Sequence, residues 1–317
     1  MYTCASLFAG VGGIDLGFEK AGVKTVYANE FDSYAADTFE KNFKIKVDRR
    51  DIHEVKASEL PDFDILLAGF PCQAFSIAGY RQGFDDEKGR GNLFFEVTRI
   101  IEEKRPRVAF FENVKNLVSH DNGNTFRVIC EQLDLLGYKY LFQVMNASEY
   151  GNIPQNRERI YIVAFRDKED YSNFSLPKSI PLTKTIKDVI DFDGEMDEKF
   201  YYTPEKCKFY DELKRSMVTS DTIYQWRRVY VRENKNNLVP TLTANMGTGG
   251  HNVPLILTHD SRIRKLTPRE CFNVQGFPKT FKLPDQSNGR LYKQAGNSVV
   301  VPVITRIAKS IILALSN

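Results

Sequence analysis

The chain has 317 residues, of which 42% are hydrophobic and 27% charged, a composition typical of a globular protein of one large or two modest domains. No apolar run approaches the ~18 residues that a membrane span needs, and the N-terminus lacks a signal peptide, so we expect a cytoplasmic protein that contacts no membrane. The five cysteines and four histidines are scattered, which argues against a disulfide framework and a metal site.

The formal net charge of +3 is unevenly distributed along the chain. Between Tyr224 and Arg269, eight basic residues stand against two acidic ones, a local net charge of +6, so the remainder of the chain carries about −3. A basic segment on a slightly acidic protein indicates a polyanionic partner such as nucleic acid. Charge alone is equally consistent with a solvated basic face.

The first half of the chain alternates short apolar runs with amphipathic stretches. This alternation predicts an α/β fold with a mainly parallel sheet covered on both faces, and ligands of such sheets bind beyond the carboxyl ends of the strands. The expected strands are residues 2–8, 24–28, 44–47, 64–68, 107–111, 139–145 and 159–165, and the intervals are helical, for example 33–42 and 94–104.

The pattern changes after Phe165. Residues 170–181 are polar and contain two prolines, which is typical of a linker. Short, irregular segments rich in Gly, Asn and Thr follow over residues 182–283 and predict a second, smaller domain. The apolar stretch 299–315 has helical spacing and is expected to pack back on the first sheet. The predicted division is a first domain of residues 1–178 and 286–317 and an inserted domain of residues 179–285.

A glycine-rich segment, Ser6-Leu7-Phe8-Ala9-Gly10-Val11-Gly12-Gly13-Ile14-Asp15, follows the first expected strand and opens a helix. Glycines let a ligand approach the backbone there, and the start of a helix presents free N–H groups. The G-x-G-G spacing differs from the G-x-G-x-x-G of dinucleotide-binding proteins, which argues against a nicotinamide cofactor. By itself the segment is equally consistent with a tight strand–helix turn.

Acidic residues end the next two expected strands. Glu30 closes the second, where a carboxylate can accept both ribose hydroxyls, and Asp51 follows the third, where it could accept from an adenine amino group. Ile52 supplies an apolar contact for the ring, and Phe8 could stack on the base or the sulfonium region. Because nothing here looks built to hold a pyrophosphate, these strand ends predict a pocket for S-adenosylmethionine.

A cysteine, an acid and two arginines stand at later strand ends. Cys72 follows Gly-Phe-Pro at the mouth of the sheet and should point into the ligand cleft, although a lone cysteine is more often a small buried hydrophobe. Glu112 could protonate or hydrogen-bond a heterocyclic base, or merely cap a helix. Arg157 and Arg159, two residues apart, should share one face of the strand that they open, where one could meet a substrate carbonyl or phosphate.

One reaction needs this combination. Cytosine C5 is a poor nucleophile until a thiolate adds to C6, after which C5 can attack a sulfonium methyl. The addition requires a cysteine with a lowered pKa and an acid near N3. The target base must also leave the duplex to be reached.

Taken together, these segments resemble bacterial DNA (cytosine-5) methyltransferases of type II restriction–modification systems, over nearly the whole chain and in the family's order. Six motifs in order make coincidence negligible. The matching segments are Phe8-Ala9-Gly10-Val11-Gly12-Gly13, Gly69-Phe70-Pro71-Cys72-Gln73, Glu112-Asn113-Val114, Gln155/Arg157/Arg159, Arg264-Lys265-Leu266-Thr267-Pro268-Arg269-Glu270, and Gly296-Asn297-Ser298-Val299.

The resemblance implies a Rossmann-like S-adenosylmethionine-dependent methyltransferase sheet with an inserted small target-recognition domain, and double-stranded DNA as the partner. The implied catalytic residues are Cys72, Glu112, Arg157 and Arg159. The implied cofactor-binding residues are Phe8, Gly10, Gly12, Gly13, Ile14, Glu30, Phe31, Asp51, Ile52, Pro71, Asn297 and Ser298. The expected DNA-binding residues are Gln73, Ser76, Arg227, Arg228, Arg232, Thr241, Asn245, Gly249 and Gly250.

Three rival functions are weaker. A related branch of the family methylates transfer RNA and carries a Cys-Phe-Thr signature, whereas this chain has Cys207-Lys208-Phe209. A DNA-binding module without activity has no need of Cys72, and a nicotinamide dehydrogenase does not fit the glycine spacing. We expect a monomer that methylates a short palindrome containing GC, of the GCNGC type, with any cognate restriction endonuclease acting separately.

Overall fold

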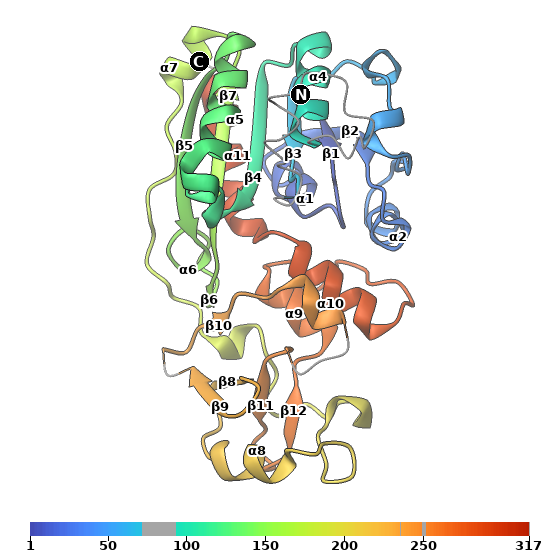
Figure 1. Cartoon of the computed structure of the whole chain (residues 1–317), viewed down its shortest axis with the longest axis vertical. Coiled ribbons are helices and arrows are strands. Elements are labelled where there is room, and N and C mark those ends of the chain that lie inside the picture. The colour runs from blue at the N-terminus through green and yellow to red at the C-terminus, as the bar shows by residue number, and fades with distance from the viewer. Residues whose placement is uncertain (72–92, 235, 249–251, 317) are drawn as a thin grey trace. The chain divides into compact units, whose positions relative to one another are not determined.

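The central sheet of the fold is mixed and mainly parallel. The computed structural model describes residues 1–71, 93–234, 236–248 and 252–316. β1 pairs in parallel with two neighbours, β3 and β4 also run parallel, and β4 and β7 are antiparallel, so the predicted α/β class is confirmed. In the described part of the chain this sheet has six strands, in the order β2 (Lys24–Asn29), β1 (Thr3–Leu7), β3 (Ile65–Ala68), β4 (Val108–Val114), β7 (Glu158–Phe165) and β5 (Lys139–Asn146) (Figure 1).

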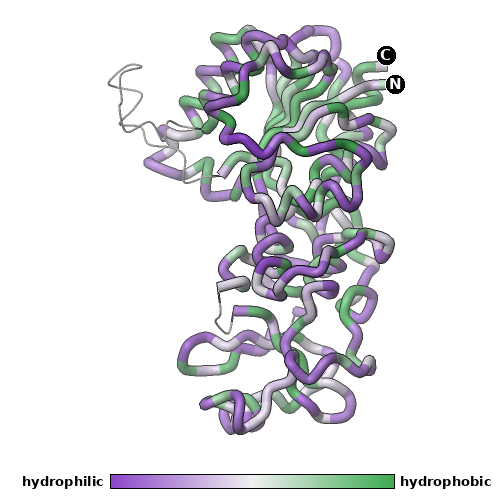
Figure 2. Tube along the Cα trace, turned by 90° about the vertical axis from the view of Figure 1, so that its right-hand side faces the viewer, coloured by the Kyte–Doolittle hydropathy of each residue, from purple (hydrophilic) through white to green (hydrophobic). Residues whose placement is uncertain are grey.

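Helices cover both faces of this sheet, because its strands are apolar on both sides. Consecutive residues of β4 show this: Phe110 packs edge-on against Phe18, with ring centroids 5.3 Å apart, whereas Phe111 lies 6.0 Å from Phe94. The Phe18 face carries α1 (Gly13–Glu19) and, packed on α1, α11 (Val301–Leu315); the Phe94 face carries α4 (Leu93–Lys104) and α5 (Asn124–Leu135). Figure 2 shows hydrophobic residues concentrated in these strands.

The C-terminal helix is a core element of the same unit. A Cβ on Gly17 would lie 2.4 Å from the Ile304 side chain, so α1 and α11 pack without any room to spare, and the Tyr2 hydroxyl donates to the Leu315 carbonyl at 2.7 Å. By length and composition alone, Asn288–Leu315 could cross a membrane, but 61% of its apolar window is buried inside the protein. α11 itself, with 15 residues, is about 22 Å long, shorter than a ~30 Å bilayer core.

The chain forms two compact units. The larger comprises Met1–Met145, Glu158–Lys178 and Val303–Asn317, and the smaller comprises Asn146–Arg157 and Ser179–Pro302. The smaller unit contains an antiparallel sheet in the order β12 (Ile263–Lys265), β11 (Leu255–Leu257), β8 (Ile223–Trp226) and β9 (Val231–Asn234). Its other elements are α6 (Ala147–Tyr150), β6 (Gln155–Asn156), α8 (Tyr210–Ser216), β10 (Val239–Pro240), α9 (Pro268–Val274) and α10 (Asn288–Asn297).

The strand expected at residues 44–47 is not formed. α2 (Ser33–Asn42) ends just before it, as predicted, but within the described chain an isolated bridge between Asn29 and Asp48 takes the place of a strand. The Val47 N–H donates to the Glu40 carboxylate at 2.9 Å, so a side chain takes the donor that a strand would use.

The segment 170–181 is not a linker throughout, contrary to expectation. Its beginning lies in α7 (Lys168–Asn173), and Asp170 in that helix is buried. The Asp170 carboxylate forms an ion pair with Arg107 at 2.9 Å. The polar residues that suggest a linker therefore include one that holds α7 against the start of β4.

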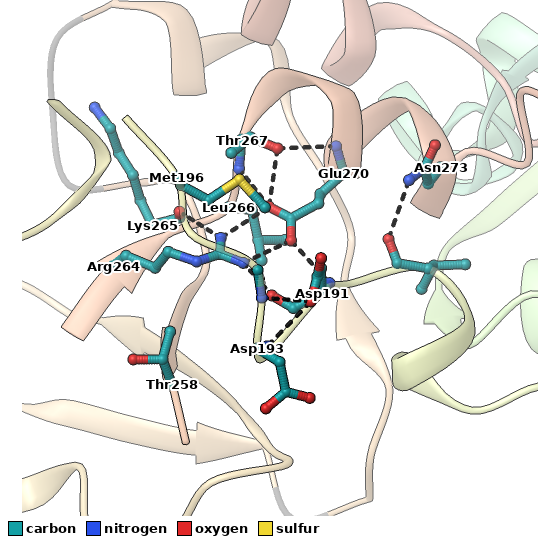
Figure 3. Close-up of polar contacts among 12 residues, drawn as sticks. Asp191, Asp193, Met196, Thr258, Arg264, Lys265, Leu266, Thr267, Glu270 and Asn273 are labelled. Carbon is teal, nitrogen blue, oxygen red and sulfur yellow. Dashed lines mark hydrogen bonds and ion pairs between the residues drawn. The ribbon is translucent and has the colours of Figure 1, made fainter. Parts of the chain in front are cut away.

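A buried ion pair joins three segments of the smaller unit (Figure 3). The fully buried Arg264 in β12 donates from both terminal nitrogens to the Glu270 carboxylate in α9, each at 2.8 Å. Arg264 also donates to the backbone oxygen of Asp191, and Glu270 accepts from the Asp191 N–H at 3.0 Å. The same carboxylate accepts the N–H and hydroxyl of Thr267 in a capping box. Two charges of the Arg-x-Leu-Thr-x-Arg-Glu segment, Arg264 and Glu270, thus join three segments of this unit.

Glu270→Ala is expected to lower the free energy of unfolding by about 3–5 kcal/mol, because it leaves the Arg264 guanidinium buried without its carboxylate. Glu198→Ala is the matched control, since it removes the partner of the exposed Arg262 at 2.6 Å and should cost less than about 1 kcal/mol. Urea unfolding measures both. Equal losses in the two variants would contradict a special role for the buried pair.

Candidate active site

The turn after β1 is shaped by glycines in two different ways. Gly12 has a φ of 84°, and a Cβ there would lie 2.3 Å from the Phe43 ring, so packing requires glycine. Gly10 has a φ of 56° but nothing within 4 Å of a Cβ position. Phe8 also adopts a positive φ, of 55°, a strained conformation for an aromatic residue. The turn therefore leaves open space over Gly10, which a ligand could occupy.

Glu30 is fixed directly beside this turn. It follows β2, and its carboxylate accepts the Gly10 N–H at 2.7 Å and the Asp32 N–H at 2.7 Å. A carboxylate can accept about four hydrogen bonds, which makes this geometry compatible with ribose hydroxyls as further donors. The glycine turn and Glu30 are thus joined by a direct hydrogen bond.

Asp51 is held near the end of β2 through its neighbours. The Asn29 side-chain amide donates to the carbonyls of Asp48 and Arg50, at 3.0 and 2.9 Å. The Asp51 carboxylate accepts the His53 N–H at 3.1 Å, and this backbone hydrogen bond lowers the pKa of Asp51. At neutral pH the group is therefore a carboxylate, the form that accepts a hydrogen bond from an adenine amino group.

Apolar residues complete the set expected around an adenosine. Ile52 and Ile14 are buried, whereas the side chain next to Glu30, Phe31, is 71% exposed. A large aromatic side chain in water at a strand end offers a face to a stacking ring. Carboxylates, an open glycine turn and an exposed ring together fit S-adenosylmethionine.

One buried residue near the start of α1, Asp15, has a role that the sequence does not reveal. The Asp15 carboxylate in α1 accepts the hydroxyls of Ser6 in β1, at 2.9 Å, and of Thr25 in β2, at 3.3 Å. Burial raises the pKa of Asp15 to about 7. Asp15 thus fastens the first two strands to α1. An acid in the first turn of a helix looks ordinary in a sequence, which is why it gave no signal.

Glu112, near the end of β4, and Arg159, near the start of β7, form an ion pair. Arg159 Nε lies 3.2 Å from Glu112 Oε1, and both side chains are largely buried. The pairing of β4 with β7 explains the contact, because Arg159 lies opposite Val114, two residues from Glu112 and on the same face. A Cβ on Gly69 would lie 3.9 Å from Glu112 Oε2. The acid is therefore beside the end of β3, from which the chain leads to Cys72.

Asn113 fixes the path of that chain. Its side-chain amide donates to the Phe70 carbonyl at 2.8 Å, and its oxygen accepts the Val114 N–H at 2.8 Å. The buried Phe70 ring packs against Phe94 and Phe111. In the sequence Asn113 is recognisable only as part of the Glu-Asn-Val motif, which gives no sign of this role. The predicted site residues Cys72, Gln73 and Ser76 lie outside the described residues.

Arg157 has different surroundings from Arg159. β7 begins at Glu158, so the expectation that both arginines lie on one face of one strand is wrong. Arg157 is buried in the smaller unit and donates to the carbonyls of Leu242, at 2.7 Å, Gly296, at 3.1 Å, and Ser298, at 2.5 Å. Its guanidinium thus joins two distant segments of the backbone.

Gln155 makes a second set of links in the same place. Its side chain donates to the Val274 carbonyl at 2.9 Å and to Gln275 at 3.1 Å, and accepts the Leu242 N–H at 3.3 Å. Asn297 ends α10 and is exposed, while Ser298 after it is buried. Gln155 and Arg157 therefore hold the backbone in place around Leu242 and Ser298.

The DNA-binding residues expected from the sequence occupy two places in the smaller unit. Arg227, Arg228 and Arg232 are exposed at the β8–β9 hairpin. The Thr241 hydroxyl donates to the Asn156 carbonyl at 2.6 Å, and Asn245 lies in the short helix η8 (Ala244–Gly247). Gly249 and Gly250 lie outside the described residues. Among the described residues, no group of three or more His, Cys, Asp or Glu side chains is placed to hold a metal ion.

Comparison with known proteins decides the family. Residues 2–313 match the family model of C-5 cytosine-specific DNA methylases. The chain belongs to this family. It is therefore a DNA (cytosine-5) methyltransferase that depends on S-adenosylmethionine, and the predicted family, enzyme class and cofactor are confirmed.

Relatives match along almost the whole chain. The type II methyltransferase M.Bsp6I from Bacillus sp. strain RFL6 is 62% identical over 312 residues, 98% of each chain. M.HhaI from Haemophilus parahaemolyticus is 41% identical over 318 residues, 96% of this chain and 92% of the relative.

Solved structures share the fold. A mutant of Spodoptera frugiperda DNMT2 has a TM-score of 0.76 at 20% identity, over 98% of this chain and all of that one. A putative DNA modification methyltransferase from an E. coli prophage has a TM-score of 0.73 at 22% identity, over the whole of both chains. At these identities the likeness concerns the fold alone.

Glu30→Ala is expected to weaken S-adenosylmethionine binding by roughly 1–3 kcal/mol, because it removes a charged acceptor that also holds the Gly10 turn. Glu103→Ala, which removes an exposed carboxylate from α4, is the control. Isothermal titration calorimetry measures both, and DNA affinity should barely change. Unchanged cofactor affinity in Glu30→Ala would refute the ribose assignment.

Proposed function

We propose that this enzyme methylates C5 of a flipped-out cytosine in a short DNA site through a covalent adduct between Cys72 and C6. The observation that best supports the proposal is the Glu112–Arg159 ion pair beside Gly69, three residues before Cys72 in the sequence. Activation of a cytosine ring needs an acid, a cation and a thiol; the first two lie beside Gly69, and the sequence supplies the third at Cys72.

The thiolate of Cys72 begins the reaction by forming an S–C6 bond. The electrons of the C5–C6 double bond shift toward C5 and N3, and N3 takes a proton that the Glu112 carboxylate has first bound from water. The Arg159 charge stabilises the Glu112 carboxylate that remains. The target base leaves the duplex first, because its C6 is otherwise inaccessible.

S-Adenosylmethionine supplies, when bound, an electrophilic methyl group on a sulfonium sulfur. With the cofactor bound, C5 would take up this methyl group, and the electron pair of the methyl–sulfur bond would stay on sulfur. A base then removes the C5 proton, the double bond re-forms, and the S–C6 electron pair returns to Cys72. The N3 proton returns to Glu112 and from there to water, which restores the enzyme.

The residues assigned to the cofactor pocket lie at successive strand ends. Gly10 and Glu30 hold the ribose side, Phe31 and Asp51 the adenine, and Phe8 the sulfonium region. Ile14, Ile52 and Pro71 are assigned to the apolar walls, and Gly12 and Gly13 to the surrounding backbone. The direct Gly10–Glu30 hydrogen bond supports the first part of this assignment.

Arg157 is proposed to position the backbone instead of touching substrate. Its two terminal nitrogens serve three carbonyls in the interior of the smaller unit. A guanidinium so engaged would have to give up several charge-assisted hydrogen bonds to reach a base. Of the two arginines expected in catalysis, Arg159 is therefore the one that we assign to the chemistry.

Residues 1–178 and 286–317 are proposed as the catalytic domain, and residues 179–285 as the target-recognition domain. The excess of basic residues in the latter supports contact with phosphates and base edges. The names of the relatives favour a role in a type II restriction–modification system, with the endonuclease a separate protein. We propose a monomer that reads a palindrome containing GC one strand at a time.

Methylation of unmodified genomic DNA, followed by base-resolution mapping of 5-methylcytosine, tests this function. The parent enzyme should place 5-methylcytosine at one short GC-containing motif. Cys72→Ser should abolish turnover, because a neutral hydroxyl is a far weaker nucleophile than a thiolate at pH 7.

Cys130→Ser is the matched control, since the same change falls on a half-buried helical cysteine and should leave the methylation map intact. Turnover by Cys72→Ser near the parent rate would rule out Cys72 as the nucleophile. A map without any common motif would refute the proposed site specificity.

A further inference from the structure

The segment of residues 49–64, which carries Asp51, joins no strand. Within these described residues the chain forms two 3-10 turns, η1 (Ile52–Glu54) and η2 (Ala57–Glu59). The backbone hydrogen bonds of such turns are local, like the one from the Glu54 N–H to the Asp51 carbonyl at 2.9 Å. Local bonds shape a turn but do not fix its position against the rest of the fold. The position of η1 therefore depends on contacts from outside the segment.

Helix α4 supplies such contacts through one arginine. Arg99 Nη2 donates to the Val55 carbonyl at 2.8 Å and, over a longer distance of 3.4 Å, to the Ile52 carbonyl. Arg99 Nε donates to the Glu96 carboxylate at 2.8 Å, which orients the guanidinium. Ile52 and Val55 also belong to the same buried cluster as Val97 of α4. The Arg99 side chain thus holds both ends of η1 against α4.

Asp51 lies between two anchors. On one side of it, the Asn29 side-chain amide donates to the Arg50 carbonyl at 2.9 Å. On the other side, Arg99 holds η1. Asp51 is the cap residue of η1, and its carboxylate accepts the His53 N–H at 3.1 Å. A displacement of η1 would therefore carry the Asp51 carboxylate with it.

We propose that Arg99 is a positioning residue for the adenine end of S-adenosylmethionine. By holding η1, it keeps the Asp51 carboxylate where it accepts a hydrogen bond from the adenine amino group, and Ile52 where it contacts the ring. Arg99 acts through these two residues, since its own donors are engaged by backbone carbonyls and Glu96. The proposal rests on the proposed assignment of Asp51 to the adenine.

Lys104 offers a matched comparison on the same helix. Its Nζ donates to the Leu60 carbonyl at 2.9 Å and to the Asp62 carboxylate at 3.0 Å. Lys104 thus binds a backbone carbonyl of the same segment, but at the end remote from Asp51. Loss of either basic side chain removes a link between α4 and the segment, whereas only loss of Arg99 should alter the recognition of adenine.

The recognition of adenine is measured as the ratio of two dissociation constants. One is for S-adenosylhomocysteine, and the other is for S-inosylhomocysteine, in which a carbonyl replaces the amino group. A carboxylate accepts from an amino group and repels a carbonyl oxygen, so the parent enzyme should prefer the adenine compound by about tenfold or more. A general loss of affinity changes both constants alike and leaves their ratio unchanged.

Isothermal titration calorimetry of the whole chain gives both constants. Arg99→Ala should reduce the preference to below about threefold and raise the KM for S-adenosylmethionine, with kcat at saturating cofactor close to that of the parent. Arg99→Lys should restore part of the preference, because a lysine on this helix can reach a carbonyl of the segment, as Lys104 does. Lys104→Ala should keep the preference of the parent. The same preference in Arg99→Ala as in Lys104→Ala would overturn the proposal.

Asp51→Asn separates failure of this inference from failure of the proposed function. An amide can accept from an amino group or donate to a carbonyl, so this variant should lose the preference. If Asp51→Asn lost the preference and Arg99→Ala kept it, Arg99 would not position the carboxylate, and the proposed function would stand. A preference equal to that of the parent in Asp51→Asn would overturn the adenine assignment, and this inference with it.

Discussion

The parallel pairing of β1, β2, β3 and β4 is the constraint on which the proposed catalytic site depends. Parallel strands end at the same edge of a sheet, so residues far apart in the sequence meet there. Glu30 after β2 reaches Gly10 after β1, and Glu112 in β4 lies beside Gly69 after β3. Because β7 runs antiparallel to β4, its first residues lie at this edge too, which brings Arg159 to Glu112.

The larger unit is held together by its sheet, whereas the smaller unit is held together by buried hydrogen bonds and ion pairs. Its strands are short, so side chains that donate to backbone carbonyls take over the task of joining segments. Arg157 and Arg264 both use their guanidinium groups in this way, the second with help from Glu270. Motif residues of this chain thus include some, such as Arg157 and Arg264, whose side chains hold the backbone in place.

The sequence predicts the larger unit well because apolar runs and caps are local signals: α2 occupies residues 33–42 as expected, with Asp32 as its cap. It predicts that Glu30 and Glu112 lie near the ends of strands, because each closes an apolar run. It does not predict the surroundings of Arg157, whose partners Leu242 and Gly296 are 85 and 139 residues away. Charges such as Asp170 and Asp15 are equally hard to place, since a buried and a solvated carboxylate look alike in a sequence.

The central claim is that Cys72 bonds to the target base during methyl transfer, and trapping that bond tests it most directly. DNA that carries 5-fluorocytosine at the target position has no C5 proton to lose, so elimination cannot follow methylation. Mass spectrometry should then find a stable protein–DNA adduct on the peptide that contains Cys72, formed with S-adenosylmethionine present and missing in Cys72→Ala. An enzyme that methylates ordinary DNA but forms no such adduct would contradict the account.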